Sequence, residues 1–479
     1  MKTLYTLLFS IASIVAAGAQ APTQIIDINP GSGNSAPTNI TVFNGSLFFS
    51  ADDTSGTNSG GVDVSREPWI SDGTATGTSL LKDINPGTGS SSPFNVFQFN
   101  NELYFTANDG DSELWKTDLT EAGTVKVDLF PSVAGDVPNN AIVFNDVVYL
   151  TTNQADGNNQ LTEWDGTNPA QIAPNSSGNG EITTVSEIAA YNGLLYLYME
   201  TTVDEPAFGR ELYSYNPATD TFTLIKDIAS GNANSGISGF TVANNLLYFE
   251  AQGDLWQSDG TENNTIEVPA AATLGMNGVN NIYNFNNDLL FEGDNGAGDQ
   301  LWILDTASGV ITQISTNSGT NANHDPSDYV TVGNVVYYRG EDSDDTSGNL
   351  FRTDGITTRQ IDNTIIDIDD LVLLDGLIYM EGDNGSDGKE LFVFNPATAS
   401  IKPVNKQVLR MYPNPSNGVV SFSGDLAADA AFSIYDLGGR SVLEGKLQNN
   451  QLTHNLTTGI YFVELQQTGI ATKMKLIVE

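Results

Sequence analysis

The sequence predicts an all-β protein, in which a β-propeller precedes a small C-terminal antiparallel β-sandwich. Three observations support this prediction: eight copies of one hairpin-forming segment recur between Val42 and Val404, every copy has turn-forming residues at the same two positions, and the pattern changes after Val404. A chain of 479 residues exceeds what a single core sustains, so a large closed β architecture or several domains are expected. We expect eight blades, with seven blades plus an accessory sheet as the alternative.

The chain begins with the features of an export signal. Lys2 lies in a short charged region, an apolar run extends from Leu7 to Ala17, and Ala17-Gly18-Ala19 has the small residues of a cleavage site. A membrane anchor is the alternative, but the run is shorter than the ~20 apolar residues of a spanning helix, and no later segment approaches that length. We therefore predict a signal peptide over residues 1–19, a mature chain from Gln20, and no transmembrane segment.

A repeated β-hairpin predicts the propeller over residues 20–404. Its copies start at Val42, Gln98, Val143, Ala190, Val242, Asn284, Thr331 and Leu373, so the spacing varies from 42 to 56 residues, as in repeats with variable loops. The turn pairs are Asn44-Gly45, Asn100-Asn101, Asn145-Asp146, Asn192-Gly193, Asn244-Asn245, Asn286-Asn287, Gly333-Asn334 and Asp375-Gly376. A type I′ turn needs left-handed backbone at both central residues, which these residue types adopt at the lowest cost.

Each repeat continues with a third strand, in which an acidic or polar residue and Leu precede an aromatic residue. The motif is ELWKTDLT from Glu113 and DLWQSDGT from Asp254, and it is weaker in ELYSYNPA from Glu211 and in LTEWDGTN from Leu161. A second turn then leads into a fourth strand, such as residues 79–84 or 124–129. Four antiparallel strands in each repeat are typical of propeller blades.

The N-terminal strand is predicted to close the ring. Residues 24–28 are followed by the sequence NPG, as are residues 80–84 of a predicted fourth strand. The N-terminal strand should therefore join the last blade, beside or in place of residues 400–404. Pairing both ends of the propeller in one blade closes the ring without exposed edges.

These units resemble the ELWxxDGT repeats of exported bacterial proteins, a family associated with propeller-type architecture. The resemblance covers about residues 24–404 and is most specific in EPWISDGT from Glu67, ELWKTDLT from Glu113 and DLWQSDGT from Asp254. It implies a propeller but no activity, because the family is defined by its repeat sequence.

The composition excludes several classes of function. The chain has no cysteine, which excludes disulfides, thiolate metal sites and a cysteine nucleophile. Its two histidines, His324 and His454, are too few for a multi-histidine zinc or iron site. The net charge of −41, from 18 basic and 59 acidic residues, argues against binding to nucleic acid or anionic membrane and favours cations, neutral glycans or basic proteins.

One face of the propeller is predicted to bind a ligand. The turns within the hairpins are tight and uniform, whereas the loops from second to third strands, and from blade to blade, are long and variable. Variable loops on a rigid ring commonly carry binding sites. Solvated turns without a role are the alternative, because they have the same composition.

Four of these loops are rich in carboxylates, and they predict calcium as a possible cofactor. Alternating Asp and Asn around a Gly can surround a hard cation with oxygen ligands, as in GDNGAGD from Gly293. None of the loops completes a known calcium-loop pattern, and acidic turns that keep the protein soluble are the alternative. The predicted ligands are Asp109, Asp111, Asp294, Asp299, Asp342, Asp344, Asp383 and Asp387.

No catalytic residues are predicted. His324 lies in the loop sequence NANHDPSD, where Asp325 or Asp328 could orient it as a general base, but a surface histidine without a role is the favoured interpretation. Paired carboxylates could support glycoside cleavage, but acidic pairs are too common in this chain to identify one.

Residues 405–479 are predicted to form a linker and an export-sorting domain. Short alternating strands are expected at residues 419–422, 431–435, 441–445, 459–465 and 473–478, which form a small antiparallel sandwich. The stretches MYPNPSNG, FSIYDLGGRSV, LTTGIYFVEL and KMKLIVE resemble, in order, the type A C-terminal sorting domain of the type IX secretion system; an adhesion-type sandwich is the alternative. The residues that carry this resemblance are Tyr412, Pro413, Asn414, Pro415, Gly418, Gly439, Gly459, Tyr461 and Lys475.

The resemblance implies export by the signal peptide, folding in the periplasm and passage across the outer membrane, with the type IX machinery as partner. The mature protein is therefore expected in the medium or on the outer-membrane surface. Its predicted function is non-catalytic binding or adhesion to an extracellular glycan or protein through the variable acidic loops. The alternative is a carbohydrate-active enzyme, a hydrolase or lyase, that uses carboxylates.

Overall fold

In the computed structural model the chain forms two compact units, Met1–Ala399 and Ser400–Glu479. The structure describes residues 21–479 apart from 62, 131–136, 154–158, 168, 174–181, 202–207, 317–322, 343–344, 398–409, 424–429, 437–439 and 468–469. The predicted signal peptide and the predicted strand at residues 400–404 lie outside the described residues. Within the described part of the chain, no helix is long and apolar enough to cross a membrane.

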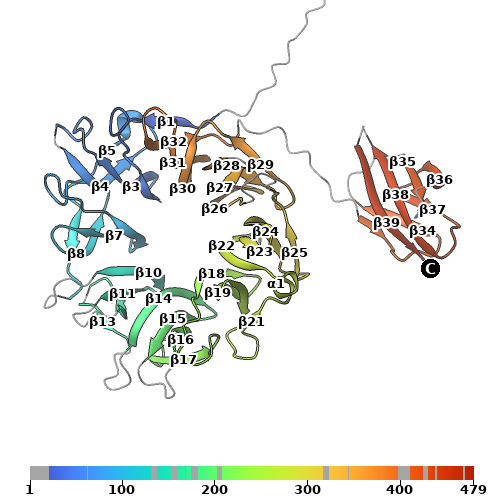
Figure 1. The fold of residues 1–479 in the computed structure, drawn as a ribbon, viewed down its shortest axis with the longest axis horizontal. Helices are drawn as coiled ribbons and strands as arrows, with labels where there is room; N and C mark the ends of the chain where they lie inside the picture. Colours follow the sequence, from blue (N-terminus) through green and yellow to red (C-terminus); the bar gives the residue numbers. More distant parts are fainter. Residues whose placement is uncertain are drawn as a thin grey trace, which may run out of the picture. The chain divides into compact units, whose positions relative to one another are not determined.

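The first unit is built from groups of four antiparallel strands that follow one another around a ring (Figure 1). The first four groups are β2 (Thr38–Phe43), β3 (Ser46–Asp53), β4 (Val64–Ser71) and β5 (Ser79–Leu80); β6 (Phe94–Phe99), β7 (Glu102–Asn108), β8 (Ser112–Thr117) and β9 (Val125–Val127); β10 (Pro138–Phe144), β11 (Val147–Asn153), β12 (Asn159–Trp164) and β13 (Gln171–Ile172); and β14 (Ile182–Tyr191), β15 (Leu194–Thr201), β16 (Glu211–Asn216) and β17 (Thr221–Lys226). One parallel residue pair, Asn159 with Thr184, joins the third and fourth groups into an eight-stranded sheet.

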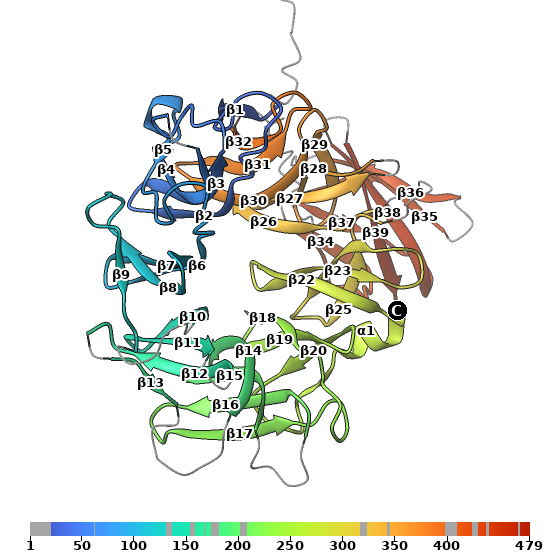
Figure 2. The same cartoon turned by 60° about the vertical axis from the view of Figure 1, so that its left-hand side comes forward.

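The second half of the ring has the same organisation. Its groups are β18 (Ser238–Ala243), β19 (Leu246–Ala251), β20 (Asp254–Ser258) and β21 (Ile266–Glu267); β22 (Asn277–Phe285), β23 (Asp288–Asp294), β24 (Gln300–Asp305) and β25 (Val310–Gln313); β26 (Ser327–Val332), β27 (Val335–Asp342), β28 (Asp345–Thr353) and β29 (Thr358–Asp362); and β30 (Ile366–Leu374), β31 (Leu377–Asp383), β32 (Lys389–Phe394) and the N-terminal β1 (Thr23–Ile26). First strands such as β22, β26 and β30 lie toward the middle of the ring, and fourth strands such as β17 and β29 lie on its rim (Figures 1 and 2). The all-β prediction is confirmed.

A two-residue turn joins the first and second strands of every group, at the eight predicted turn pairs. In seven of these turns both residues have positive φ, for example 49° at Asn44 and 76° at Gly45, as predicted for type I′ turns. In the eighth, Gly333 has φ 62° and Asn334 does not have positive φ, so the prediction of two left-handed residues is wrong there. Glycine in the first position alone is typical of a type II′ turn.

Apolar side chains pack between each group of strands and the next. For example, Phe48 of β3 and Phe105 of β7 have ring centroids 4.9 Å apart within one buried cluster. Eight such clusters occur around the ring, and one of them packs Trp69 of β4 with Tyr379 and Leu391 of the last group. Burial of this apolar surface is the main source of stability, at about 25 cal/mol per Å².

The N-terminal strand pairs with the last group, as the sequence predicts. In β1, Thr23 lies opposite Val393 and Gln24 opposite Phe392 of β32. The buried carboxylate of Glu390 then holds the following segment, because it accepts hydrogen bonds from the Ile28 N–H (2.8 Å), the Ser35 N–H (3.2 Å) and the Ser35 hydroxyl (2.6 Å). The two ends of the ring are thereby joined without a covalent link.

Glu67 holds the segment that follows the first group in the same way as Glu390 holds the segment that follows β1. Its carboxylate accepts hydrogen bonds from the Ile84 N–H (2.9 Å), the Ser91 N–H (3.0 Å) and the Ser91 hydroxyl (2.6 Å). Because Glu67 takes these backbone groups, the fourth strand β5 ends at Leu80, and the prediction that it extends over residues 79–84 is wrong. Strand β9 is likewise shorter than predicted, and the six-residue helix α1 (Pro269–Leu274) was not predicted.

The Asp-x-Thr turns of the repeats, in which x is Gly73, Leu119 or Gly260, are also structural. The Asp72 carboxylate accepts hydrogen bonds from the N–H (2.9 Å) and the hydroxyl (2.6 Å) of Thr74, and Asp118 and Asp259 hold Thr120 and Thr261 in the same way. Gly73 has φ +88° and a side chain there would overlap the Tyr379 hydroxyl of the last group. Glycine is therefore required by both backbone conformation and packing between neighbouring groups.

Each first strand contains a register shift, and seven have a left-handed Asn, Asp or Gly five residues before the hairpin turn. These residues are Asn39, Asn95, Asn140, Gly239, Asn281, Asp328 and Asp370. Several of them bond to the neighbouring group: Asn95 Oδ1 accepts from the Ala141 N–H (3.1 Å), Asn140 Nδ2 donates to the Ser186 carbonyl (2.8 Å), and Asp370 Oδ2 accepts from the Asn39 N–H (2.7 Å). Bulges thus link the innermost strands to one another.

The second unit consists of two antiparallel sheets that share one apolar core. One sheet contains β33 (Arg410–Tyr412), β34 (Val419–Ser423) and β37 (Gln451–Thr453), and the other contains β36 (Ser441–Lys446), β35 (Ala431–Tyr435), β38 (Gly459–Gln467) and β39 (Ile470–Val478). The shared core includes Phe422 from the first sheet and Ile434, Val463 and Leu476 from the second. The five predicted strands are present, and β33 and β37 were not predicted.

Candidate functional site

Three of the eight predicted calcium ligands, Asp294, Asp383 and Asp387, have hydrogen-bond partners in their own loops. Asp109 forms an ion pair with Lys126 (3.1 Å), and Asp111 is exposed. Asp294 accepts hydrogen bonds from the N–H groups of Gly296 (2.7 Å) and Gly298 (2.9 Å). Asp383 and Asp387 likewise accept from Gly385 and Asn384, Asp342 is exposed, and Asp344 lies outside the described residues.

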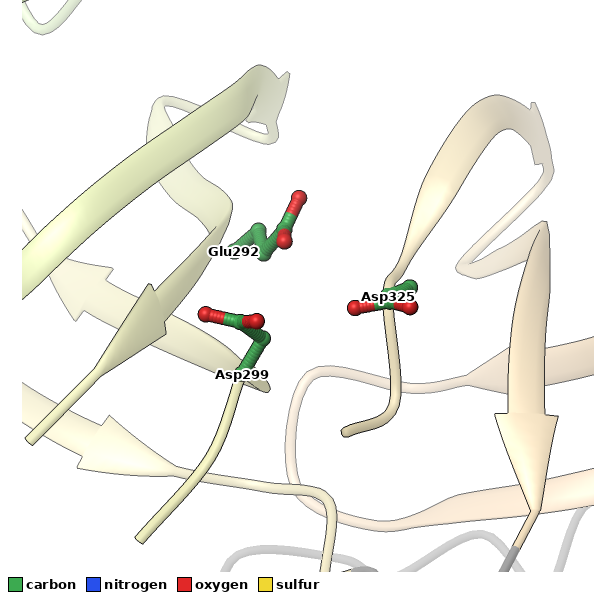
Figure 3. Close-up of side chains that lie close together, drawn as sticks. All are labelled: Glu292, Asp299 and Asp325. Atoms are coloured by element: carbon green, nitrogen blue, oxygen red, sulfur yellow. The ribbon is translucent and has the colours of Figure 1, made fainter. Parts of the chain in front are cut away.

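Asp299 belongs to a group of carboxylates from two neighbouring sheets. One carboxyl oxygen each of Glu292, Asp299 and Asp325 lies within 4.8 Å of the others, and all three residues are half-buried. Glu292 is on β23, Asp299 directly precedes β24, and Asp325 lies in the segment before β26. Figure 3 shows the three side chains close together, with the first two on one side and Asp325 opposite them. We call these three residues the carboxylate cluster.

Backbone hydrogen bonds of a buried histidine position the cluster. The N–H of His324 donates to the Asp299 carbonyl (2.6 Å), and the Glu341 N–H donates to the His324 carbonyl (2.6 Å). These bonds connect β24 with β27 through the segment that carries Asp325. They fix Asp325 opposite Glu292, although the two residues are far apart in the sequence.

Burial and mutual repulsion raise the pKa values of the cluster. The pKa of Glu292 is raised to about 7, first by burial and then by the charges of Asp299 and Asp325, against a hydrogen bond from Asn281 Nδ2 (2.8 Å). Burial and the charges of Asp325 and Asp294 also raise the pKa of Asp299. Groups of carboxylates in a partly desolvated site either share protons or hold a cation.

Glu341 and Arg339 of β27 border the cluster. Arg339 donates from Nη1 to the Asp325 carbonyl (3.3 Å), and its Nη2 lies 3.4 Å from Glu341 Oε1. The Glu341 side chain is only 6% exposed, and its Oε2 has no hydrogen-bond partner among the described residues. Burial, and then the charge of Asp325, raise the pKa of Glu341, and Arg339 opposes this shift.

His324 is buried, so its interpretation as a surface histidine is wrong. Its Nδ1 lies 2.6 Å from the Glu341 carbonyl oxygen and its Nε2 lies 3.0 Å from the Tyr338 hydroxyl. The ring packs against Phe351 with a centroid distance of 4.8 Å, and burial lowers the pKa of His324. Because both nitrogens are engaged, the histidine serves the structure and is not available as a general base.

In the second unit, the residues of the sorting motifs lie at one turn and on the last two strands. Asn414 Nδ2 donates to the Lys475 carbonyl (2.8 Å), and Asn414 Oδ1 accepts from the Ile477 N–H (2.8 Å). Pro413 and Pro415 follow cis peptide bonds, Gly418 has φ 140°, and Tyr412 is exposed. Lys475 lies opposite Phe462 in the β38–β39 pair, Gly459 and Tyr461 are on β38, and Gly439 lies outside the described residues.

Residues 410–479 match the family model described as a secretion system C-terminal sorting domain. The chain carries a type IX export tail. It is therefore a type IX secretion substrate, and export places it on the cell surface or in the medium. A search of curated proteins found no match.

Several solved structures are similar to the ring. They include puromycin hydrolase (13% identity, TM-score 0.47, 76% of this chain and 60% of that chain) and the extracellular domain of a one-component system from B. thetaiotaomicron (12%, 0.42, 96% and 58%). Another is the β-propeller domain of the Trilobed protease from Pyrococcus furiosus (11%, 0.40, 69% and 97%). The chain spans about 60% of the length of puromycin hydrolase. With TM-scores below 0.5, none of these structures indicates an activity for this chain.

Glu292 and Glu341 were not predicted from the sequence as site residues, and Asp325 was predicted only as a partner of His324. A usable signal is present, because Glu occupies the ninth position of the hairpin repeat in the fifth, sixth and eighth copies only, as Glu250, Glu292 and Glu381. That position lies near the end of a second strand, beside the variable loops.

Proposed function

We propose that this protein is a non-catalytic binding or adhesion protein with an eight-bladed β-propeller. A signal peptide over residues 1–19 and a sandwich-type sorting domain deliver it to the cell surface or the medium. The observation that carries the proposal is that the polar residues of the repeat motifs have structural roles. Their conspicuous polar residues, such as Glu67, Asp72 and Glu390, bind backbone groups of turns and loops. The recurring side chains therefore build the ring, and the parts free to specialise are the loops.

The loops between second and third strands vary most in length. Turns between first and second strands always have two residues, whereas loops between second and third strands range from two residues, 252–253, to ten residues, 54–63. Together with the net charge of −41, this favours a neutral glycan or a basic protein as ligand. Calcium at the predicted loop carboxylates would neutralise part of this charge and order the loops.

The alternative is a carbohydrate-active enzyme, and one observation favours it. Glu292 has its pKa raised to about 7 and lies near Asp299, and a carboxylic acid that titrates near neutral pH can act as a general acid. Turnover that depends on Glu292 would identify this second function.

A binding screen with paired charge variants tests the proposal. The mature full-length chain is applied to a glycan array and to a panel of basic proteins, beside Asp383→Asn/Asp387→Asn on the variable loops. The control is Asp146→Asn/Asp375→Asn, which removes the same charge from hairpin turns on the other face. We expect the loop variant to weaken binding several-fold and the control to leave it unchanged; equal effects, or no bound ligand, would contradict the proposal.

A further inference from the structure

We propose that Glu292, Asp299, Asp325 and Glu341 bind a hard divalent cation of the calcium class between the sheet β22–β25 and the sheet β26–β29. Carboxyl oxygens of Glu292, Asp299 and Asp325 lie within 4.8 Å of one another, and Glu341 of β27 borders this group. Glu292 lies on β23, Asp299 directly precedes β24, and Asp325 lies in the segment before β26. The cation would link two neighbouring blades by coordinating residues from both. This site goes beyond the proposed ligand-binding function and does not depend on it.

The charges around the site are unbalanced without a cation. The four carboxylates are joined by Asp294, whose charge acts on Asp299, and by Asp342, whose charge acts on the adjacent His324. Arg339 is the basic side chain that acts on Glu292 and Glu341 among the described residues.

Glu341 supplies a separate indication of a ligand. Its side chain is 6% exposed, and its Oε2 is inaccessible to water and has no hydrogen-bond partner among the described residues. In addition to burial, the charge of Asp325 acts on Glu341 and raises its pKa. A buried carboxylate oxygen without a partner is costly, and neighbouring carboxylates repel each other unless a proton or a cation lies between them, so a bound cation would account for both observations.

The chemistry of the ligands selects the kind of cation. All four side chains offer carboxylate oxygens, which suit calcium, magnesium or manganese and not the softer metals that prefer sulfur or imidazole. Calcium accepts six to eight oxygen ligands in irregular geometry, whereas magnesium requires near-octahedral geometry at shorter distances. Carboxylates from separate elements, without a regular arrangement around one point, fit the less demanding ion.

Calorimetric titration of the mature full-length protein with calcium chloride tests the site. We expect a calcium-binding site that Asp299→Asn weakens at least tenfold, with Glu292→Gln as a second variant if the first does not fold. Glu341→Gln should also weaken binding. The matched control is Asp146→Asn, which removes one exposed carboxylate from a hairpin turn and should bind calcium as the wild type does. Equal weakening in the control, or no binding heat in the wild type, would overturn the proposal.

Thermal melting provides a second readout that separates ligation from a folding defect. In EDTA, Asp299→Asn should melt no lower than the wild type, because it removes one of several like charges. Calcium should raise the melting temperature of the wild type more than sodium chloride of equal ionic strength does, and it should not do so for Asp299→Asn. Equal shifts in the two salts would show that the acids only share protons, and equal affinity for magnesium would overturn the assignment to the calcium class.

Discussion

Replacing Glu390 with alanine should loosen the closure of the ring. The buried carboxylate accepts three short hydrogen bonds from Ile28 and Ser35, and both of these residues are fully buried or nearly so. Hydrogen bonds to a charged acceptor contribute about 1.5–3 kcal/mol each. Burial raises the pKa of Glu390 to about 7, so the carboxyl group is only partly ionised at neutral pH, and its removal also relieves the cost of burying a charge. We expect Glu390→Ala to lower the free energy of unfolding by about 3 kcal/mol.

The assay is hydrogen exchange combined with thermal melting, with Glu67→Ala as the matched variant. Glu67 makes the same set of bonds, to Ile84 and Ser91, but within a continuous stretch of chain. Both variants should melt at lower temperature. Only Glu390→Ala should also expose the amides of β1, because the segment that Glu390 holds follows β1 directly. Unchanged protection of β1 in Glu390→Ala would refute the claim that this carboxylate closes the ring.

Three further predictions follow from the structure. Gly73→Ala should lower the free energy of unfolding by about 2–3 kcal/mol, since it combines a positive φ with overlap on Tyr379. Gly87→Ala, at φ +93° in open space, should lower it by about 1 kcal/mol. Denaturant titration measures both free energies. Glu292 has a pKa of about 7 in the folded protein, above its value in the unfolded chain. In EDTA its contribution to the free energy of unfolding is therefore present at pH 4 and is lost as the pH rises through 7. Glu292→Gln should flatten the plot of melting temperature against pH over this range, and an unchanged plot would contradict the raised pKa of Glu292. Deleting residues 473–479 removes most of β39, including the buried Leu476, and should keep the protein inside the cell; cell fractionation showing normal surface or medium levels would refute this.

Much of the ring could be predicted because its determinants are local. The positive φ of the hairpin turns depends on two adjacent residues, and the pairing of β1 is indicated by the NPG sequence shared with residues 85–87. The ends of the fourth strands could not be predicted in this way. They depend on Glu67, which is distant in the sequence from the N–H groups of Ile84 and Ser91 that it binds.

The candidate site was less accessible to sequence reasoning, because it is formed by tertiary contacts. Asp299 was predicted from its acidic loop, but its closest carboxylates are on β23 and in the segment before β26, which no local pattern places together. His324 has the sequence context of a surface loop, yet two backbone hydrogen bonds draw it into the space between β24 and β27. Such pairings depend on the packing of neighbouring sheets.

The most direct test of the central claim is a turnover measurement on the ligand that the binding screen identifies. The mature protein, at a concentration above its dissociation constant, is incubated with that ligand for a day, and released reducing ends and unsaturated products are measured. Binding without catalysis predicts saturable association and no product above the level of a heat-denatured control. Product formation that is lost in Glu292→Gln or Asp299→Asn would contradict the account and identify the ring as a carbohydrate-active enzyme.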